Sequence, residues 1–198
     1  MTTANTRTSD HPIDKLFLER WSPRAFTSEA ISHDTLMTIL EAGRWAASSY
    51  NSQPWRFLYA LRGTPSFDVF LDLLVPFNQS WCKPAAALVF IVSKSTMQPP
   101  GADKPVPSHT HSFDAGTASA QIALQAHISG WATHGMSGVD FPRAFGVLNV
   151  PEGYRVEAAF AVGRPGDPSL LPEQMAAREK PSGREALATM VMEGGFKA

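Results

Sequence analysis

The chain has 198 residues, of which 43% are hydrophobic, and this length and apolar content suit one globular domain with a substantial core. Its formal net charge of -1 at pH 7 argues against a general binder of nucleic acid or acidic membranes, because such proteins carry a basic excess. The single cysteine, Cys82, excludes a disulfide framework or a CxxC zinc site within one chain, and we interpret it as a small core residue.

The first 11 residues are polar and lack the apolar middle of a secretory signal, so we interpret them as a flexible arm. No apolar run has the length that crosses a bilayer, and the cytoplasm is the expected location. After the arm, Asp10 and Pro12 predict a short helix with Ile13, Leu16 and Phe17 on its inner face. The helix is expected to end near the segment ERWSPRAF.

Ser32 is the predicted N-cap of a second helix, and the segment RFLYALRG predicts a strand that stops at Gly63. The buried face of the second helix is predicted to contain Leu36, Ile39, Leu40 and Gly43. A third helix opens at Thr64 and Pro65, with a buried stripe of Phe67, Phe70, Leu71 and Leu74. The continuous apolar run over 85–94 is typical of a strand covered on both faces.

Residues 95–112 are polar and rich in proline, which predicts a long surface loop, either an active-site lid or a flexible insertion. The loop contains His109 and His111, but no carboxylate or cysteine is spaced to complete a metal site with them. Asp114 is expected to cap a long central helix that carries small residues in its early turns and continues past His127 to His134.

A short helix over 143–148 and a strand over 155–163 complete the predicted core. The final section, SGREALATMVMEGGFKA, follows a polar linker and could extend well away from that core. Helices that alternate with a few buried strands, without internal repeats or a second-domain boundary, predict a layered α/β or α+β domain.

Two groups of cationic and hydroxyl side chains point to an anionic ligand. Arg20, Ser22 and Arg24 alternate along an extended segment, so their side chains share one side, and two guanidiniums with a hydroxyl suit a phosphate. The same arginines could instead form surface ion pairs. A second group of this kind lies near the C-terminus and contains Lys180, Ser182 and Arg184.

The stretch ASSYNSQPWRF, at 47–57, places two serines, an asparagine and a glutamine just before a strand. Such a segment fits either a tight turn or a contact with a ligand that has many polar edges. The GxSxG, HExxH and GxxxxGK[ST] motifs, which are common signatures of hydrolases, metalloproteases and P-loop proteins, are absent from the sequence.

Taken together, these segments resemble the nitroreductase-like flavoproteins. The stretch from FLERWSPRAF to NSQPWRFLYA is similar to that family's Arg-x-Ser-x-Arg/Lys segment, helix and Pro-Ser-x-x-Asn-x-Gln-Pro-Trp turn. NQSW, DAGTASAQIALQA, HGMSGVDF, AFAVGRPGD and a C-terminal arginine follow in the family's order, so the resemblance covers nearly the whole chain. The sequence departs from the pattern at Ala47, where the family most often has proline.

The resemblance implies an α+β (layered α/β), nitroreductase-like fold with a central mixed sheet flanked by helices. It implies one FMN-binding domain over 1–198, in an intertwined homodimer whose tail, 185–198, reaches the partner subunit. FMN would lie at the interface, with its phosphate and ribityl held by Arg20, Ser22, Arg24 and Arg184, and with Arg24 also near the ring. Ser48 and Ser49 would contact the flavin of the other subunit, and Asn51 and Gln53 would line the same turn. Asn78 would hydrogen-bond the flavin ring, and the loop with Ser137 and Gly138 would approach flavin N5.

The implied activity is hydride transfer from NADH or NADPH to flavin N5, followed by reduction of a nitroaromatic, a quinone or a similar electron-poor small molecule. No side chain need act as an acid or base, so we predict no catalytic residue. We also predict no metal ligand and no nucleic-acid or membrane partner. Three alternatives are a relative with a dedicated substrate (of the dehalogenating or flavin-cleaving type), a non-catalytic flavin-binding or redox-sensing protein, and a structural domain without flavin.

Overall fold

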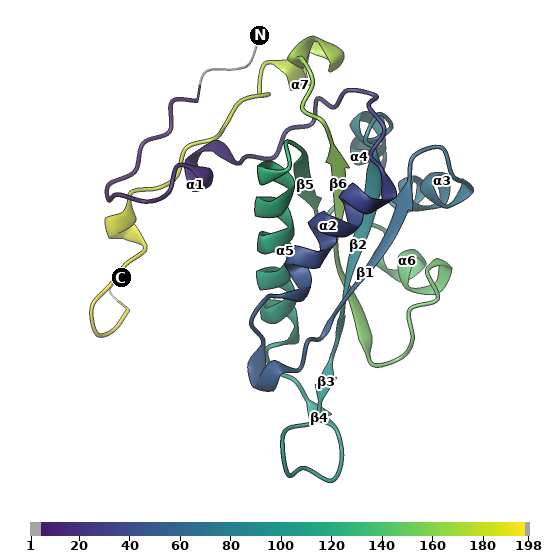
Figure 1. The fold of residues 1–198 in the computed structure, drawn as a ribbon, viewed down its shortest axis with the longest axis vertical. Coiled ribbons are helices and arrows are strands. Elements are labelled where there is room, and N and C mark those ends of the chain that lie inside the picture. The colour runs from purple at the N-terminus through teal and green to yellow at the C-terminus, as the bar shows by residue number, and fades with distance from the viewer. Residues whose placement is uncertain (1–4, 197–198) are drawn as a thin grey trace.

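A four-stranded sheet forms the centre of the molecule in the computed structural model, which describes residues 5–196 (Figure 1). Of the predicted arm and tail, residues 1–4 and 197–198 lie outside the described part. The strand order is β1 (Trp55–Leu61), β2 (Ala87–Lys94), β6 (Tyr154–Gly163) and β5 (Ala132–Met136). The α+β class is confirmed, but the predicted mixed sheet is wrong for the described strands, because every neighbouring pair runs antiparallel.

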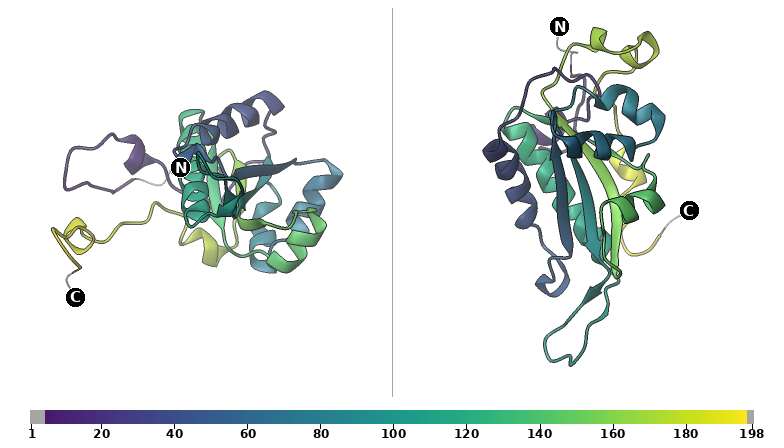
Figure 2. Two further views of the ribbon diagram at one scale, coloured as in Figure 1. Left: turned by 90° about the horizontal axis from the view of Figure 1, so that it is seen from below. Right: turned by 90° about the vertical axis from the view of Figure 1, so that its right-hand side faces the viewer.

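Two layers of helices cover the sheet, one on each face (Figures 1 and 2). Helices α2 (His33–Arg44) and α5 (His111–Ile128) pack together on one face. The other face is covered by α3 (Pro65–Asp72), α4 (Pro76–Cys82) and α6 (Phe141–Val147). As predicted, β2 is buried on both faces: Leu88 and Phe90 pack toward the second helical layer, and Val89 and Ile91 pack toward α2 and α5. Cys82 is fully buried, as expected of a core residue.

Helix α2 begins where the sequence predicts, because the Ser32 hydroxyl accepts a hydrogen bond from the Thr35 backbone N–H at 3.1 Å. Its predicted inner face is confirmed: Leu36, Ile39, Leu40 and Gly43 are buried. A Cβ added at Gly43 would lie 2.8 Å from the side chain of Ile122 on α5. The absence of a side chain at Gly43 therefore lets α2 and α5 pack at close range.

The predicted first helix is reduced to one turn, α1 (Leu16–Glu19), and its expected inner face is not covered within the described chain. Ile13 and Phe17 are 51% and 55% exposed. The long central helix also ends earlier than predicted. Gly130 adopts a φ of +75°, and the Trp131 N–H bonds the Ala126 carbonyl at 2.8 Å, which closes α5 with a Schellman-type motif.

The segment 95–112 is more ordered than the predicted loop. It forms a hairpin of β3 (Thr96–Met97) and β4 (Val106–Pro107), and its last two residues belong to α5. The helix begins after Thr110, so Asp114 lies in its first turn and is not the predicted N-cap. The hairpin projects from the lower end of the molecule in Figure 1.

Short helical turns occur at η1 (Ser49–Asn51), η2 (Pro168–Leu170), α7 (Glu173–Ala176) and η3 (Leu187–Thr189). After α7 the chain leaves the sheet and runs beside the N-terminal arm, away from the main body (Figures 1 and 2). Among the described residues, none of the helices is long and apolar enough to cross a bilayer.

Candidate functional site

Three arginines from distant parts of the sequence converge where the two terminal segments meet. Arg20 directly follows α1, and Arg184 lies in the C-terminal segment. Arg7, in the N-terminal arm, connects them. Its Nε donates to the Ser182 carbonyl at 2.7 Å, and its Nη1 donates to the carbonyls of Leu18 and Arg20 at 3.1 and 2.8 Å. The arm is therefore hydrogen-bonded to both segments through Arg7.

The cluster of Arg7, Arg20 and Arg184 concentrates positive charge. Burial lowers the pKa of Arg20, and the charge of Arg184 lowers it further. The pKa of Arg7 is lowered by burial, then by Arg184 and Arg20. Within residues 5–196, none of the three guanidiniums forms an ion pair with a carboxylate. A bound anion would relieve this repulsion, and guanidiniums recognise phosphate particularly well.

Ser22 and Arg24 extend the site from the arginine cluster toward α4. The Arg20 Nη1 lies 3.5 Å from the Ser22 hydroxyl, and the Arg24 guanidinium lies 5.8 Å from the centre of the Trp81 ring. The buried carboxylate of Glu179 accepts hydrogen bonds from the backbone N–H groups of Arg24 and Ala25 at 2.5 and 2.7 Å. Glu179 therefore fixes the position of this segment through its backbone.

A pocket of about 450 Å³ opens beside Arg24. Its wall combines two guanidiniums with apolar and polar side chains: Arg24, Phe77, Pro172, Glu173, Gln174, Met175 and Arg178. A volume of this size is within the range of small-molecule sites. The space next to the cationic segment can therefore hold a small aromatic molecule.

Asn78 and Gly138, two of the predicted site residues, are in direct contact. The Asn78 side-chain amide donates to the Gly138 carbonyl at 3.1 Å, and Asn78 is only 8% exposed. A Cβ added at Gly138 would lie 2.4 Å from the Asn78 Nδ2, so only glycine allows this approach. The neighbouring Ser137 is exposed at the end of β5. Together these residues form a polar edge where the backbone at Gly138 carries no side chain. Such an edge suits the rim of a planar heterocycle.

The amide-rich stretch forms a strained turn. Tyr50, Asn51 and Gln53 all adopt left-handed backbone conformations, with φ of 52°, 53° and 48°. The Ser48 hydroxyl accepts from the Gln53 N–H at 3.0 Å, and the Ser49 N–H donates to the buried Asp114 carboxylate at 3.2 Å. Strain of this kind persists only where surrounding contacts hold it, and it is concentrated at functional sites.

Within one chain, this turn and the arginine cluster lie at opposite ends of α5. Ser49 contacts Asp114 in the first turn of that helix, whereas Glu19, next to Arg20, lies 3.9 Å from His127 in the last turn. Asp114 and His127 are roughly 20 Å apart along α5 at about 1.5 Å of rise per residue. The structure therefore brings Arg20, Ser22 and Arg184 together and Asn78 and Gly138 together, but it leaves Ser48, Ser49, Asn51 and Gln53 far from the arginines.

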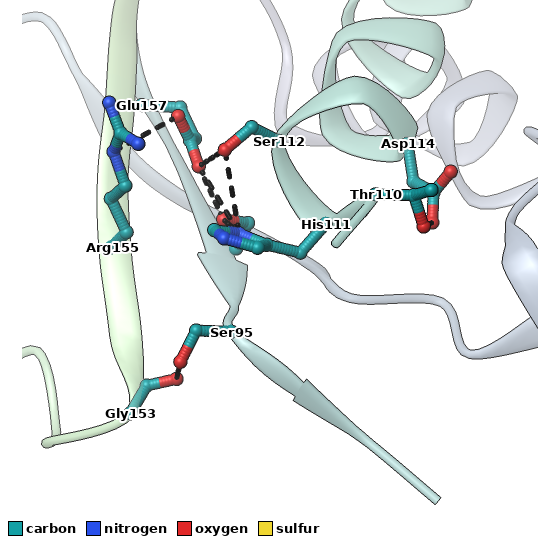
Figure 3. Close-up of polar contacts among 9 residues, drawn as sticks. Ser95, Thr110, His111, Ser112, Asp114, Gly153, Arg155 and Glu157 are labelled. Carbon is teal, nitrogen blue, oxygen red and sulfur yellow. Dashed lines mark hydrogen bonds and ion pairs between the residues drawn. The ribbon is translucent and has the colours of Figure 1, made fainter. Parts of the chain in front are cut away.

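His111 and His134 occupy positions that the sequence did not predict. Figure 3 shows His111 in the first turn of α5, where its Nδ1 lies 2.7 Å from the Ser93 hydroxyl, which in turn donates to Glu157 at 2.5 Å. Ser93 is fully buried, so we interpret this network as a structural link between β2, β6 and α5. Among the described residues, no group of three or more His, Cys, Asp or Glu side chains could hold a metal ion.

His134 is a strand residue in β5 rather than a helical neighbour of His127. Its ring centre lies 4.7 Å from that of Trp81, and its Nδ1 donates to the Pro23 carbonyl at 3.0 Å. Burial and the charge of Arg24 lower the pKa of His134. The ring therefore packs behind the cationic segment in its neutral form.

Arg7 and Glu179 were missed by the sequence analysis, as was the contact of Asp114 with the turn. All three act through backbone groups of segments far away in the sequence. The only available signal for Arg7 was an isolated cation in a polar arm, which is not specific.

Comparison with known proteins agrees with this geometry. Residues 18–65, which contain the Arg20 segment and the strained turn, match the Nitroreductase family. A crystal structure described as an oxidoreductase containing FMN is 44% identical, with a TM-score of 0.93 over 100% of this chain and 99% of that chain. A second, described as a nitroreductase from Desulfovibrio desulfuricans in complex with FMN, is 25% identical, with a TM-score of 0.71 over 96% of this chain and all of the other.

A curated protein is also similar in sequence. An uncharacterized 15.4 kDa protein of Mycolicibacterium smegmatis is 32% identical over 120 residues, which cover 59% of this chain and 76% of that protein. The arginine segment, the strained turn and the fold thus point to the same family as the full-length structural match. The chain belongs to the nitroreductase family.

Proposed function

We propose that this protein is an FMN-dependent oxidoreductase. It takes hydride from NADH or NADPH and reduces a nitroaromatic, a quinone or a similar electron-poor small molecule. The observation that carries the proposal is the convergence of Arg7, Arg20 and Arg184 without a carboxylate partner in the described chain. FMN-containing structures among the relatives support the same cofactor. When bound, FMN would supply the redox chemistry, which is hydride transfer through N5.

The protein's own residues would bind and orient the cofactor. In this proposal Arg20, Ser22 and Arg184 hold the phosphate and ribityl, and Arg24 lies near the ring. Asn78, Ser137 and Gly138 provide the polar edge for the ring, where their hydrogen-bonding groups would favour the electron-rich reduced form. The pocket beside Arg24 leaves space for a donor or an acceptor. No protein acid or base is assigned, since water can supply protons.

A second copy of the chain would complete the site. Ser48, Ser49, Asn51 and Gln53 lie roughly 20 Å from the arginines along α5, so the partner would supply them. Exposed apolar side chains support a homodimer: Phe113 and Ile128, near the two ends of α5, are 77% and 65% exposed. We propose a single FMN-binding domain over 1–198 whose tail, 185–198, reaches the partner. The cytoplasmic location stays a prediction.

The first experiment is an absorbance spectrum of the purified protein, followed by release and identification of the chromophore. We expect FMN at about one per chain, bleached by NADH or NADPH without oxygen, and steady turnover with a quinone or a nitroaromatic. A colourless protein that takes up no added FMN would contradict the proposal. Flavin that binds but does not turn over would favour a redox-sensing role instead.

A further inference from the structure

The N-terminal arm is anchored where the candidate phosphate site lies. The Asn5 side-chain amide donates to the Leu18 carbonyl at 2.9 Å, two residues before Arg20. Arg7 donates to the same carbonyl, to that of Arg20 and to that of Ser182. The arm therefore packs onto both segments that carry the candidate phosphate ligands.

The contacts of Arg7 join those two segments through one guanidinium. Nη1 donates to the backbone of Arg20 itself, and Nε donates to Ser182, two residues before Arg184. A guanidinium can do this because its planar fork offers five N–H donors in fixed directions, whereas the donors of a lysine ammonium all lie on one nitrogen. Arg7 thus sets the distance between the two arginines that come from opposite ends of the sequence.

Arg7 still has donors to offer after these contacts. Within residues 5–196 its Nη2 has no hydrogen-bond acceptor, and its guanidinium has no carboxylate partner. A third cation beside Arg20 and Arg184 adds repulsion in the absence of a ligand. That arrangement is reasonable if a doubly negative group binds among the three, because a terminal phosphate can accept several charge-assisted hydrogen bonds.

We propose that Arg7 belongs to the FMN phosphate site, where it holds the Arg20 and Ser182–Arg184 segments in register and supplies a third guanidinium to the phosphate. This inference rests on the proposed function. It assigns a role in cofactor binding to the N-terminal arm. A purely structural contact between the chain's ends is the competing explanation, and the two differ in what they predict for a flavin without phosphate.

Riboflavin provides that comparison, because it carries the same ring and ribityl as FMN but no phosphate. The full-length chain would be loaded with either flavin, and the dissociation constant would be measured from the rise of free-flavin fluorescence on dilution. For Arg7→Gln we expect FMN binding to weaken about tenfold to a hundredfold, because the variant loses one hydrogen bond to a charged group. Riboflavin affinity should stay within about twofold of wild type. Arg7→Lys should fall between, since it keeps the charge but loses the fork.

Arg143→Gln is the matched control, because Arg143 is an exposed arginine on α6 that pairs with Asp72 at the end of α3. It should leave both affinities unchanged. Equal weakening of FMN and riboflavin binding by Arg7→Gln, or no change in either, would overturn the role at the phosphate. A wild-type protein that binds neither flavin would instead contradict the proposed function itself. Thermal unfolding of each variant separates these results from loss of fold.

Discussion

At Gly138 the backbone passes so close to Asn78 and Val75 that a methyl group has no room. We expect Gly138→Ala to displace the Asn78 amide, to lower the free energy of unfolding by about 1–3 kcal/mol and to weaken flavin binding. Denaturant unfolding and FMN titration would measure the two effects. Gly146→Ala is the control, because Gly146 lies on α6 with nothing within 4 Å of an added Cβ. Wild-type flavin affinity in Gly138→Ala would contradict the role of this close approach.

His134 makes stability depend on pH. Burial, followed by the charge of Arg24, lowers its pKa below the ordinary value of 6.5. When the pH falls below about 6.5, the unfolded chain binds a proton that the folded state resists, so the free energy of unfolding decreases. His134→Gln removes this titration. The drop in Tm between about pH 7.5 and pH 5.5 should therefore be smaller in the variant than in wild type.

The control for this experiment is His33→Gln, since His33 is an exposed histidine at the start of α2. Its pH dependence of Tm should follow wild type. If His134→Gln also follows wild type, other groups dominate the acid sensitivity of the fold.

Among the elements, the start of α5 and the strained turn depend on one another through Asp114. Asp114 is 4% exposed, and its carboxylate accepts from the Ser49 N–H and from the Thr110 hydroxyl. Asp114→Ala leaves the Ser49 N–H without its acceptor and should cost about 1–3 kcal/mol of stability, with a lower flavin content. Asp114→Asn keeps an acceptor oxygen and should lie closer to wild type in both measurements.

Ser32→Ala is the control for a general loss of helix stability. That change removes the N-cap of α2 and should cost about 1 kcal/mol without altering flavin content. If Asp114→Ala and Ser32→Ala lose stability and flavin in the same proportion, Asp114 has no specific role in positioning the turn.

The elements with local signals were predictable from the sequence. The cap at Ser32 and the unbroken apolar run of β2 specify their own structure, because the interactions that form them lie within a few residues. The end of α5 was missed, since apolar spacing continues past it and Gly130 was the one cue to the break. The pairing directions within the sheet depend on how connections return across the molecule, which periodicity does not encode.

The candidate site was predictable in part for the same reason. The spacing of Arg20, Ser22 and Arg24 suggested an anion, and the structure brings Arg184 to the same place. Arg7 gave no usable signal, because its contact with Ser182 spans 175 positions. The distance of the strained turn from the arginines is a property of the folded chain, set by the length of α5.

For the whole molecule, a shared site makes a sharp prediction for mixed dimers. One chain carries Arg20→Ala and Arg184→Ala, and the other carries Ser48→Ala and Asn51→Ala. The homodimer of either variant should bind little FMN. In a two-fold symmetric dimer of the two, one site receives intact residues from both chains, so the purified heterodimer should hold about one flavin. Differently tagged chains and an absorbance spectrum would measure this.

Heterodimers that form but stay colourless would contradict a site shared in this way. A wild-type monomer that binds a full complement of FMN would do so as well. Either result would mean that the turn at 48–53 has no part in the flavin site of a neighbouring subunit.

The contact of Arg7 with Ser182 also has a consequence for the timing of biosynthesis. The two residues are 175 positions apart, so at about 5–20 residues per second the ribosome adds Ser182 roughly 10 to 35 s after Arg7. Until then the nascent chain can form α2 and the first strands, but it cannot close the arginine cluster. If FMN binds as proposed, its capture at this cluster would therefore follow the synthesis of the C-terminal segment, which pairs with an arm that was made first.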